Sequence, residues 1–236
     1  MNRLRGIGLV AVATAALAGC ETAQVRVPDG FAANASQYDV SGHSPRRFNE
    51  PVRFGPYSAL EMRDGGTFSW AIPVGSVDVG RAARHYAFTL VARDQPPVEV
   101  QCRVRTWTAA RGDSDSMLEV DLTALAGPMM ACGLWLDGAP QAMPLELSRK
   151  GTRMDGRLQS PWGEYQVRSL HGYAGSSWPA AEPTGFEVLQ SGSPLMVVDM
   201  LNAGRVHMDP GPDGEQRAYL AAAAAALLLV AQELEL

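Results

Sequence analysis

The feature that most constrains the fold is an apolar run near the C-terminus. Residues 218–231 contain no polar side chain except the hydroxyl of Tyr219, and residues 221–226 are all alanine. Alanine and leucine form helices readily, and Asp213 with Gln216 has the spacing of an N-terminal capping pair. A helix that is apolar on every side must be surrounded by protein or lipid. The run extends only about 21 Å, less than a bilayer core, so we expect a protein-buried helix over residues 213–235, with a membrane-inserted tail or an exposed docking helix as the alternatives.

Between residues 51 and 208 the dominant pattern is an alternation of apolar and polar side chains. Val98, Val100, Cys102 and Val104, for example, are separated by charged or polar residues, as in a strand with one buried face. About a dozen such short segments follow one another, separated by turn-forming residues such as those at 64–66 (Asp-Gly-Gly). The pattern predicts one mainly β domain over residues 51–236, an antiparallel barrel or sandwich. A helix rich in alanine is narrow enough to pass through such a barrel.

An antiparallel barrel with a helix through its middle is similar to the tubby-like fold of tubby C-terminal domains, LURP-one proteins and phospholipid scramblases. The similarity covers residues 51–236 and rests on strand number, hairpin spacing and the helix that follows the turn at 204–206. It implies a protein that binds lipid or another apolar ligand. Tubby domains bind phosphoinositides through basic residues, and the densest basic group here, at residues 149–157, is not a comparable cluster. A two-sheet sandwich with the helix across one end and an open sheet curled around the helix are the competing folds.

The first twenty residues resemble the export signal of a bacterial lipoprotein. Arg3 and Arg5 precede an uncharged run over residues 6–19, and residues 17–20 read Leu-Ala-Gly-Cys, the form of a lipobox. The uncharged run is too short to span a bilayer but has the length of a signal peptide's apolar region. The resemblance implies that the signal peptide, residues 1–19, is removed and that Cys20 carries a diacylglyceryl group and fatty acid such as palmitate. The alternative is a buried or amphipathic N-terminal helix.

This export route predicts a protein held at the cell envelope by lipid on Cys20. Glu21 stands where aspartate is the best-known signal for inner-membrane retention, which favours the periplasmic face of the outer membrane. Residues 20–50 show no sustained period of 2 or 3.6 and contain several turn signals, so we expect the lipidated cysteine followed by a flexible tether. The alternative is that residues 24–27 or 37–40 pack on the domain as an edge strand.

Two further cysteines, Cys102 and Cys132, fall on the apolar faces of predicted strands. The oxidising conditions outside the cytoplasm favour a disulfide between them. If the strands at 98–106, 117–124 and 130–136 pair in that order, however, the cysteines lie two strands apart, roughly 9–10 Å. That separation exceeds the usual Cα–Cα limit of about 7 Å, so a disulfide and two buried thiols both stay open.

The sequence contains no recognisable catalytic constellation, and it predicts no catalytic residues, no cofactor and no metal site. The motifs of a nucleophile elbow, a phosphate-binding loop and a paired-histidine zinc helix are absent. A net charge of −5 does not favour a nucleic-acid partner. We therefore predict a non-enzymatic scaffold or binding module that is anchored by lipid, and a lipid- or apolar-ligand-binding protein of tubby-like type is the alternative.

Overall fold

The computed structural model describes residues 22–42, 50–74, 77–113, 116–125 and 127–234 of the chain. In this part of the chain, thirteen strands join a single antiparallel sheet, accompanied by a short 3-10 helix (Thr123–Leu125) and one long helix, α2 (Gly214–Leu234). The strands are β1 (Ser36–Asp39), β2 (Val52–Phe54), β3 (Tyr57–Val74), β4 (Val77–Ala92), β5 (Val98–Asp113), β6 (Ser116–Asp121), β7 (Met130–Leu136), β8 (Met143–Lys150), β9 (Arg153–Ser160), β10 (Gly163–Leu170), β11 (Gly185–Gln190), β12 (Ser193–Asp199) and β13 (Arg205–Met208).

Twelve of the strands form a closed barrel in the order β1-β13-β12-β11-β10-β9-β8-β7-β5-β4-β3-β2. The ring closes just beyond β1, where Ser41 and Arg53 of β2 exchange two backbone hydrogen bonds of 2.8 and 2.9 Å. Strand β6 lies outside the ring and pairs with β5. The barrel predicted from the alternating pattern is therefore confirmed, and the sandwich and open-sheet alternatives do not apply.

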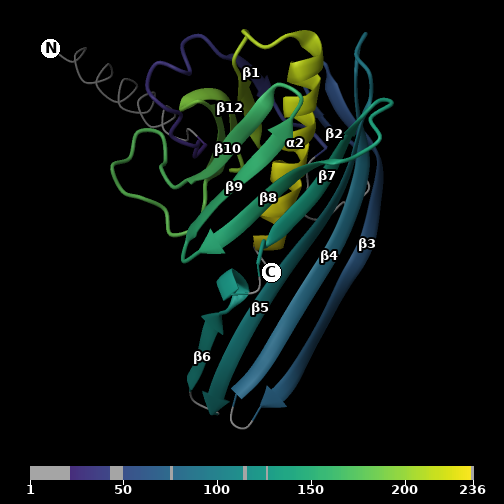
Figure 1. The fold of residues 1–236 in the computed structure, drawn as a ribbon. Helices are drawn as coiled ribbons and strands as arrows, with labels where there is room; N and C mark the ends of the chain where they lie inside the picture. Colours follow the sequence, from purple (N-terminus) through teal and green to yellow (C-terminus); the bar gives the residue numbers. More distant parts are fainter. Residues whose placement is uncertain (1–21, 43–49, 75–76, 114–115, 126, 235–236) are drawn as a thin grey trace, which may run out of the picture.

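Helix α2 runs through the barrel and fills it (Figure 1). Residues 218–230 are buried along their whole length, facing the inward side chains of the wall. The backbone N–H of Gln216 donates to Asp213 Oδ1 at 2.8 Å, which is the expected N-terminal cap, while the Gln216 side chain donates to the hydroxyl of Tyr165. The helix is also tied to the wall at its middle, because the Tyr86 hydroxyl donates to the carbonyl of Ala226 at 2.9 Å. The apolar run is thus the core of the barrel, as its composition predicted.

Residues 22–42 are not the flexible tether expected from the sequence; they belong to the barrel. Val25 is buried, and its N–H donates to Asp199 Oδ2 at 3.1 Å. Strand β1 pairs with β13 from Ser36 to Asp39. These hydrogen bonds satisfy backbone groups that would otherwise have to bond to water. The alternative prediction, that part of this segment packs on the domain as a strand, therefore applies. The predicted signal peptide, Cys20 and residues 43–49 lie outside the described residues.

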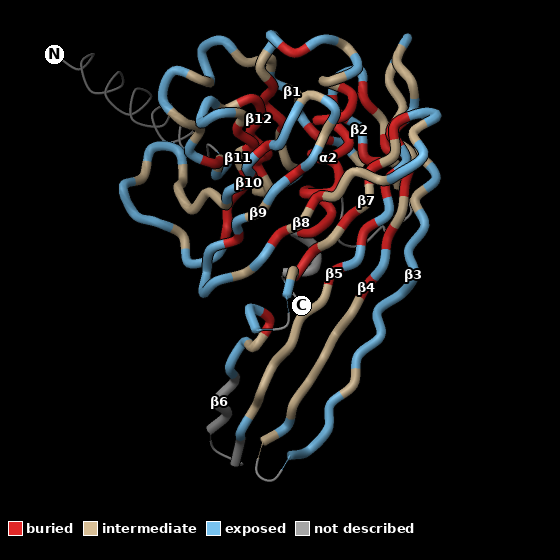
Figure 2. Tube along the Cα trace, in the orientation of Figure 1, coloured by how far each residue is buried: buried red, intermediate tan, exposed pale blue. Residues whose placement is uncertain are grey.

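Strands β3, β4 and β5 are far longer than the others, and their outer halves project from one end of the barrel (Figure 1). We call this projection, residues 68–74, 77–83, 105–113 and 116–121, the arm. Wherever side-chain exposure is described in the arm, the residue is exposed or intermediate, and Figure 2 shows the change from buried barrel to unburied arm. The Asp-Gly-Gly segment at 64–66, expected as a turn, is instead an irregularity inside the continuous strand β3.

An ion pair holds the base of the arm to the barrel. The Arg84 side chain is only 7% exposed, and it donates to both carboxylate oxygens of Asp64, at 2.7 and 3.1 Å. These hydrogen bonds hold the pKa of Asp64 below its ordinary value despite partial burial. The two residues lie on neighbouring strands, so the pair fixes β3 against β4 where the sheet leaves the barrel.

No helix formed by the described residues is both long enough and apolar enough to cross a membrane.

Candidate functional site

The two predicted cysteines form a disulfide in the wall of the barrel. Cys102 of β5 lies directly opposite Cys132 of β7, with the Cα atoms 4.0 Å apart. The expected strand order was wrong, because β6 pairs with the outer half of β5 and leaves its inner half to β7. Both cysteines are 4% exposed and face the core, so this bridge crosslinks the wall and presents no reactive sulfur.

The arm has two faces of different character. In the barrel, even-numbered side chains of β4 and β5, such as Tyr86 and Val100, point into the core. Odd-numbered ones therefore point outward, and this alternation continues into the arm. We call the side of the arm that continues the barrel's outer wall the outward face.

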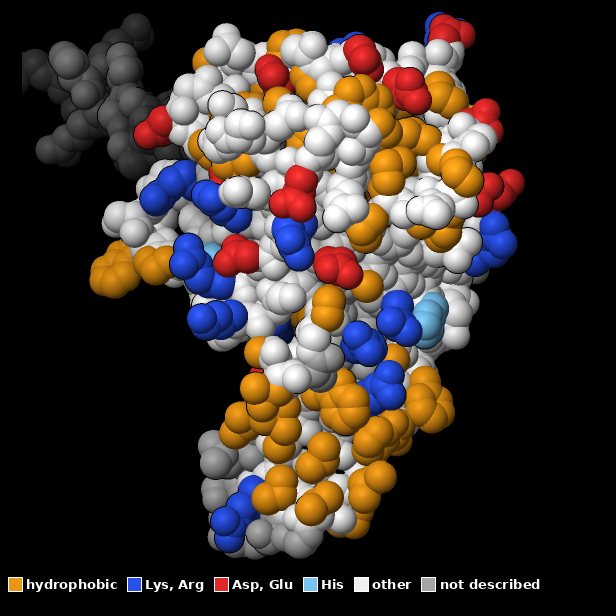
Figure 3. Space-filling view, viewed as in Figure 1, with side chains coloured by type: hydrophobic (Ala, Val, Ile, Leu, Met, Phe, Trp, Pro, Cys, Tyr) orange, Lys and Arg blue, Asp and Glu red, His pale blue; other side chains and the backbone are white. Residues whose placement is uncertain are grey.

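Large apolar side chains cover the outer end of the outward face. Ile72 is 53% exposed and Val74 60%, and on β6 Val120 is 47% exposed; Phe68, which is 69% exposed, lies nearer the barrel, level with Arg105. The strand register places them with other apolar residues, since Ile72 lies opposite Val79. Figure 3 shows the resulting apolar surface on the arm. Soluble monomers rarely expose such contiguous patches unless something binds there.

Two tryptophans lie between this apolar end and the barrel. Trp70 of β3 and Trp107 of β5 pack edge to face with ring centroids 5.8 Å apart. The guanidinium of Arg81, on the intervening strand, lies 5.2 Å from the centre of the Trp107 ring. The Trp107 indole N–H and the Arg81 Nε–H have no hydrogen-bond acceptor within the described part of the chain.

Cationic side chains surround the base of the outward face. Arg81, Arg103 and Arg105 gather there from two neighbouring strands, with His85 beside Arg103 in the register. We call these four residues the basic collar. Burial lowers the pKa of Arg105, and the positive charges of Arg103 and Arg81 lower it further. Arg105 donates a long hydrogen bond of 3.5 Å to the Pro128 carbonyl.

No carboxylate occurs on the outward face of the arm among the side chains that the structure describes. Asp78 is an even-numbered residue of β4, and Asp121 lies opposite Thr108, an even-numbered residue of β5, so both lie on the opposite face. In the described ranges, neither Arg81 nor Arg103 forms an ion pair.

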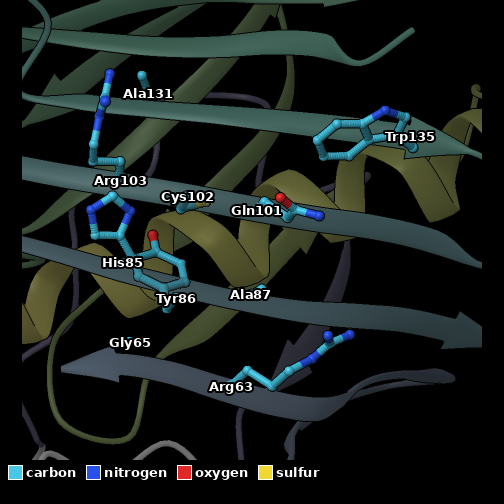
Figure 4. A pocket seen from close by; sticks show the side chains of 10 residues that line it. All are labelled: Arg63, Gly65, His85, Tyr86, Ala87, Gln101, Cys102, Arg103, Ala131 and Trp135. Atoms are coloured by element: carbon cyan, nitrogen blue, oxygen red, sulfur yellow. The ribbon is translucent and has the colours of Figure 1, made fainter.

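A hollow of 420 Å³ adjoins the collar on the outer wall of the barrel. Its floor contains small residues such as Ala87 and Ala131, and the side chains of Arg63, Arg103 and Trp135 rise around it (Figure 4). A Cβ atom on Gly65, which also lines the hollow, would lie only 3.1 Å from Cβ of His85, so glycine allows the two strands to lie close there. No carboxylate lines this hollow, although Glu99 lies opposite Trp135 nearby. The hollow and the arm form one continuous basic and apolar surface.

Two members of the basic group that was densest in the sequence form ion pairs with neighbours. Arg149 lies 3.2 Å from Asp121 and 3.3 Å from Glu182, and Arg157 lies 3.9 Å from Glu164. Sequence reasoning missed the collar because its members come from different strands. A signal was present nonetheless: Trp107 follows Glu99, Gln101, Arg103 and Arg105 in the series of odd-numbered residues on β5 and ends their polar run.

The structure brings together one pair with catalytic potential, Ser169 and His171. The Ser169 hydroxyl lies 3.0 Å from His171 Nε2 and also accepts the N–H of Met154 at 2.9 Å. The other ring nitrogen of His171 lies 3.3 Å from the carbonyl of Ala180, where a catalytic dyad would place a carboxylate. These bonds crosslink β9, β10 and the loop that follows. Within the described ranges, no three His, Cys, Asp or Glu side chains cluster as metal ligands.

Comparison with known proteins adds no relative. No protein-family model matches the chain, no curated protein is similar to it, and no solved structure matches its fold. The similarity to tubby-like proteins stays a prediction, and function has to be argued from the surface described above.

Proposed function

We propose that the protein is a non-enzymatic, lipid-anchored binding module of the cell envelope that binds anionic groups in the hollow beside the basic collar. The observation that carries this proposal is the concentration of Arg63, Arg81, Arg103 and Arg105 on one surface without an intervening carboxylate. The chain as a whole has a net charge of −5, so the concentration is not a consequence of composition.

The chemistry of the side chains favours an oxyanion as ligand. A guanidinium offers several N–H donors in a planar fork, which suits the oxygens of phosphate or carboxylate. Arg103 and Arg63 rise from different strands around the hollow, so an anion between them would receive donors from two directions. Trp135 adds an apolar wall beside the anion.

The barrel interior supports binding on the wall rather than inside. Residues 218–230 of α2 are buried and occupy the space in which a ligand-carrying barrel would hold its ligand. A lipid- or apolar-ligand-binding protein that carries its ligand within the barrel is therefore less well supported than recognition on the outer wall.

The lipid anchor is supported by the lipobox at residues 17–20. We expect intact-mass analysis of the membrane-extracted protein to give a chain that begins at a lipid-modified Cys20. An unprocessed N-terminus, or a mature chain without fatty acid, would contradict the anchor.

Anion binding can be tested on the full chain in neutral detergent, with pyrophosphate as the probe and calorimetry as the measurement. Replacing one arginine of the hollow removes charge-assisted hydrogen bonds of about 1.5–3 kcal/mol, so Arg103→Gln should weaken binding by about tenfold or more. Arg153→Gln is the matched control, because Arg153 is exposed and lies outside the hollow. Equal affinities of the two variants, or no binding by the wild-type chain, would overturn the proposed site.

A further inference from the structure

The strand directions place the N-terminal segment and the arm at the same end of the barrel. Val104, at the base of the arm, lies opposite Met130, the first residue of β7. The antiparallel pairing continues from strand to strand, so the last residues of β10 and β12 lie at the same end of the barrel as the base of the arm. Asp199, the last residue of β12, accepts the N–H of Val25. Thr22, two residues from Cys20, therefore lies near the same end of the barrel as the arm, but on the side of the ring opposite β5.

An exposed aromatic loop leaves the same rim. Trp178 is 80% exposed and lies between the end of β10 and the start of β11. Tryptophan is enriched at the boundary between membrane and water. A bilayer that holds lipid on Cys20 would thus face a rim that also carries Trp178 and the arm.

The outward face of the arm presents three kinds of side chain that a membrane interface accepts. The collar, with Arg105 and Arg103, lies at the base, the pair Trp70 and Trp107 comes next, and aliphatic side chains such as Ile72 cover the outer end. Arginine suits the headgroup phosphates, tryptophan the interface and aliphatic groups the boundary of the acyl chains. Arg111, near the outer end, has a side chain long enough to return its charge to the headgroups.

The charges exclude a second copy as the natural occupant of this face. A two-fold contact would bring the collar of each copy against the same surface of the other. Because no carboxylate occurs among the described side chains of this face, such a contact would oppose arginines without neutralising them. A bilayer containing anionic lipid supplies both the negative charge and the apolar layer.

We propose that the outward face of the arm lies on an anionic bilayer as a membrane contact separate from the lipid anchor. This inference rests on the proposed function, since the collar that binds headgroup phosphates adjoins the hollow. The opposite face carries the polar side chains of Asp78 and Thr106, which stay hydrated. The arm therefore lies along the interface and does not cross the bilayer.

The test uses two adjacent residues whose side chains lie on opposite faces of β3. Ile72→Cys and Ala71→Cys are each labelled with an environment-sensitive fluorophore in the full, lipidated chain; both positions are exposed, so neither change disturbs packing. In vesicles of phosphatidylcholine with phosphatidylglycerol, the probe at 72 should shift to the blue and brighten, whereas the probe at 71 should report water. In vesicles of phosphatidylcholine alone, or with Arg81→Gln and Arg105→Gln added, the shift at 72 should be lost.

Each other outcome overturns the inference. Equal signals at positions 71 and 72, or a signal at 72 that ignores both lipid charge and the arginine substitutions, would show that the outward face is not seated on anionic lipid. A shift at 72 that grows with protein concentration at a fixed detergent concentration, in the absence of vesicles, would mean that a second copy covers the face. Pyrophosphate binding that depends on Arg103, without any vesicle response at 72, would leave the proposed function standing and refute the arm contact alone.

Discussion

A single carboxyl group at the middle of the buried helix should prevent the barrel from folding. Ala224 is fully buried, and so are the alanines on both sides of it, from Ala221 to Ala226. The Ala224→Asp side chain would therefore meet only apolar neighbours in a space filled by the wall.

The size of the effect follows from two costs. An aspartic acid that stays protonated still leaves polar atoms unpaired, at about 1–3 kcal/mol. The added atoms overpack a filled interior, at about 1–3 kcal/mol more. An ionised carboxylate would cost several kcal/mol on its own account. The sum is a large part of the roughly 5–15 kcal/mol that stabilises an ordinary domain.

Urea unfolding, followed by circular dichroism, measures this directly on the full chain. Ala224→Asp should show no cooperative transition or a transition at much lower urea. Ala224→Ser should lose only about 1 kcal/mol, because a hydroxyl in a helix can bond to a carbonyl of the preceding turn. Ala33→Asp, at an exposed position, is the matched control and should change stability by no more than about 0.5 kcal/mol. A midpoint for Ala224→Asp equal to that of Ala33→Asp would refute the burial of the helix.

Two further predictions concern the barrel wall. The disulfide between Cys102 and Cys132 closes a loop with a sequence separation of 30. Replacing both cysteines by serine should therefore lower the free energy of unfolding by about 3–4 kcal/mol. An unchanged urea midpoint would argue against the bridge. Burial lowers the pKa of His207 from the ordinary value of 6.5, with the charge of Arg205 lowering it further and Asp39 opposing. Because the pKa of His207 is lower in the folded than in the unfolded chain, its contribution to the free energy of unfolding is fully present above about pH 6.5 and is lost as the pH falls from there towards the folded pKa. His207→Gln should reduce this loss in urea titrations at several pH values. An unaltered pH dependence would contradict the assignment.

The elements that could be predicted from the sequence are those whose signal is local. The apolar run at 218–231 and the cap at Asp213 are read within a few turns of helix, and α2 spans Gly214–Leu234 as expected. The alternation at 98–104 likewise belongs to one strand and is matched by its burial pattern. Such signals do not depend on which other segment lies alongside.

The elements that could not be predicted depend on pairing between distant segments. Strand β6 pairs with the outer half of β5, which leaves β7 beside the inner half and brings Cys102 opposite Cys132. The same uncertainty hides the arm, because no local pattern shows that 67–74 and 77–83 continue strands of the barrel. The basic collar was missed for the same reason, since Arg81 and Arg105 are neighbours only after β4 and β5 have paired.

By itself, the amino-acid sequence determined the mainly β composition, the helix apolar on all its sides and the resemblance of its first twenty residues to a lipoprotein signal. Each of these is recorded in the periodicity or chemistry of a short segment. Only the tertiary structure decided that the sheet closes around the helix, that β1 completes the wall and that three strands extend into an uncovered arm. Those outcomes depend on hydrogen bonds between strands far apart in the chain, and no local pattern specifies the partner that a strand will meet.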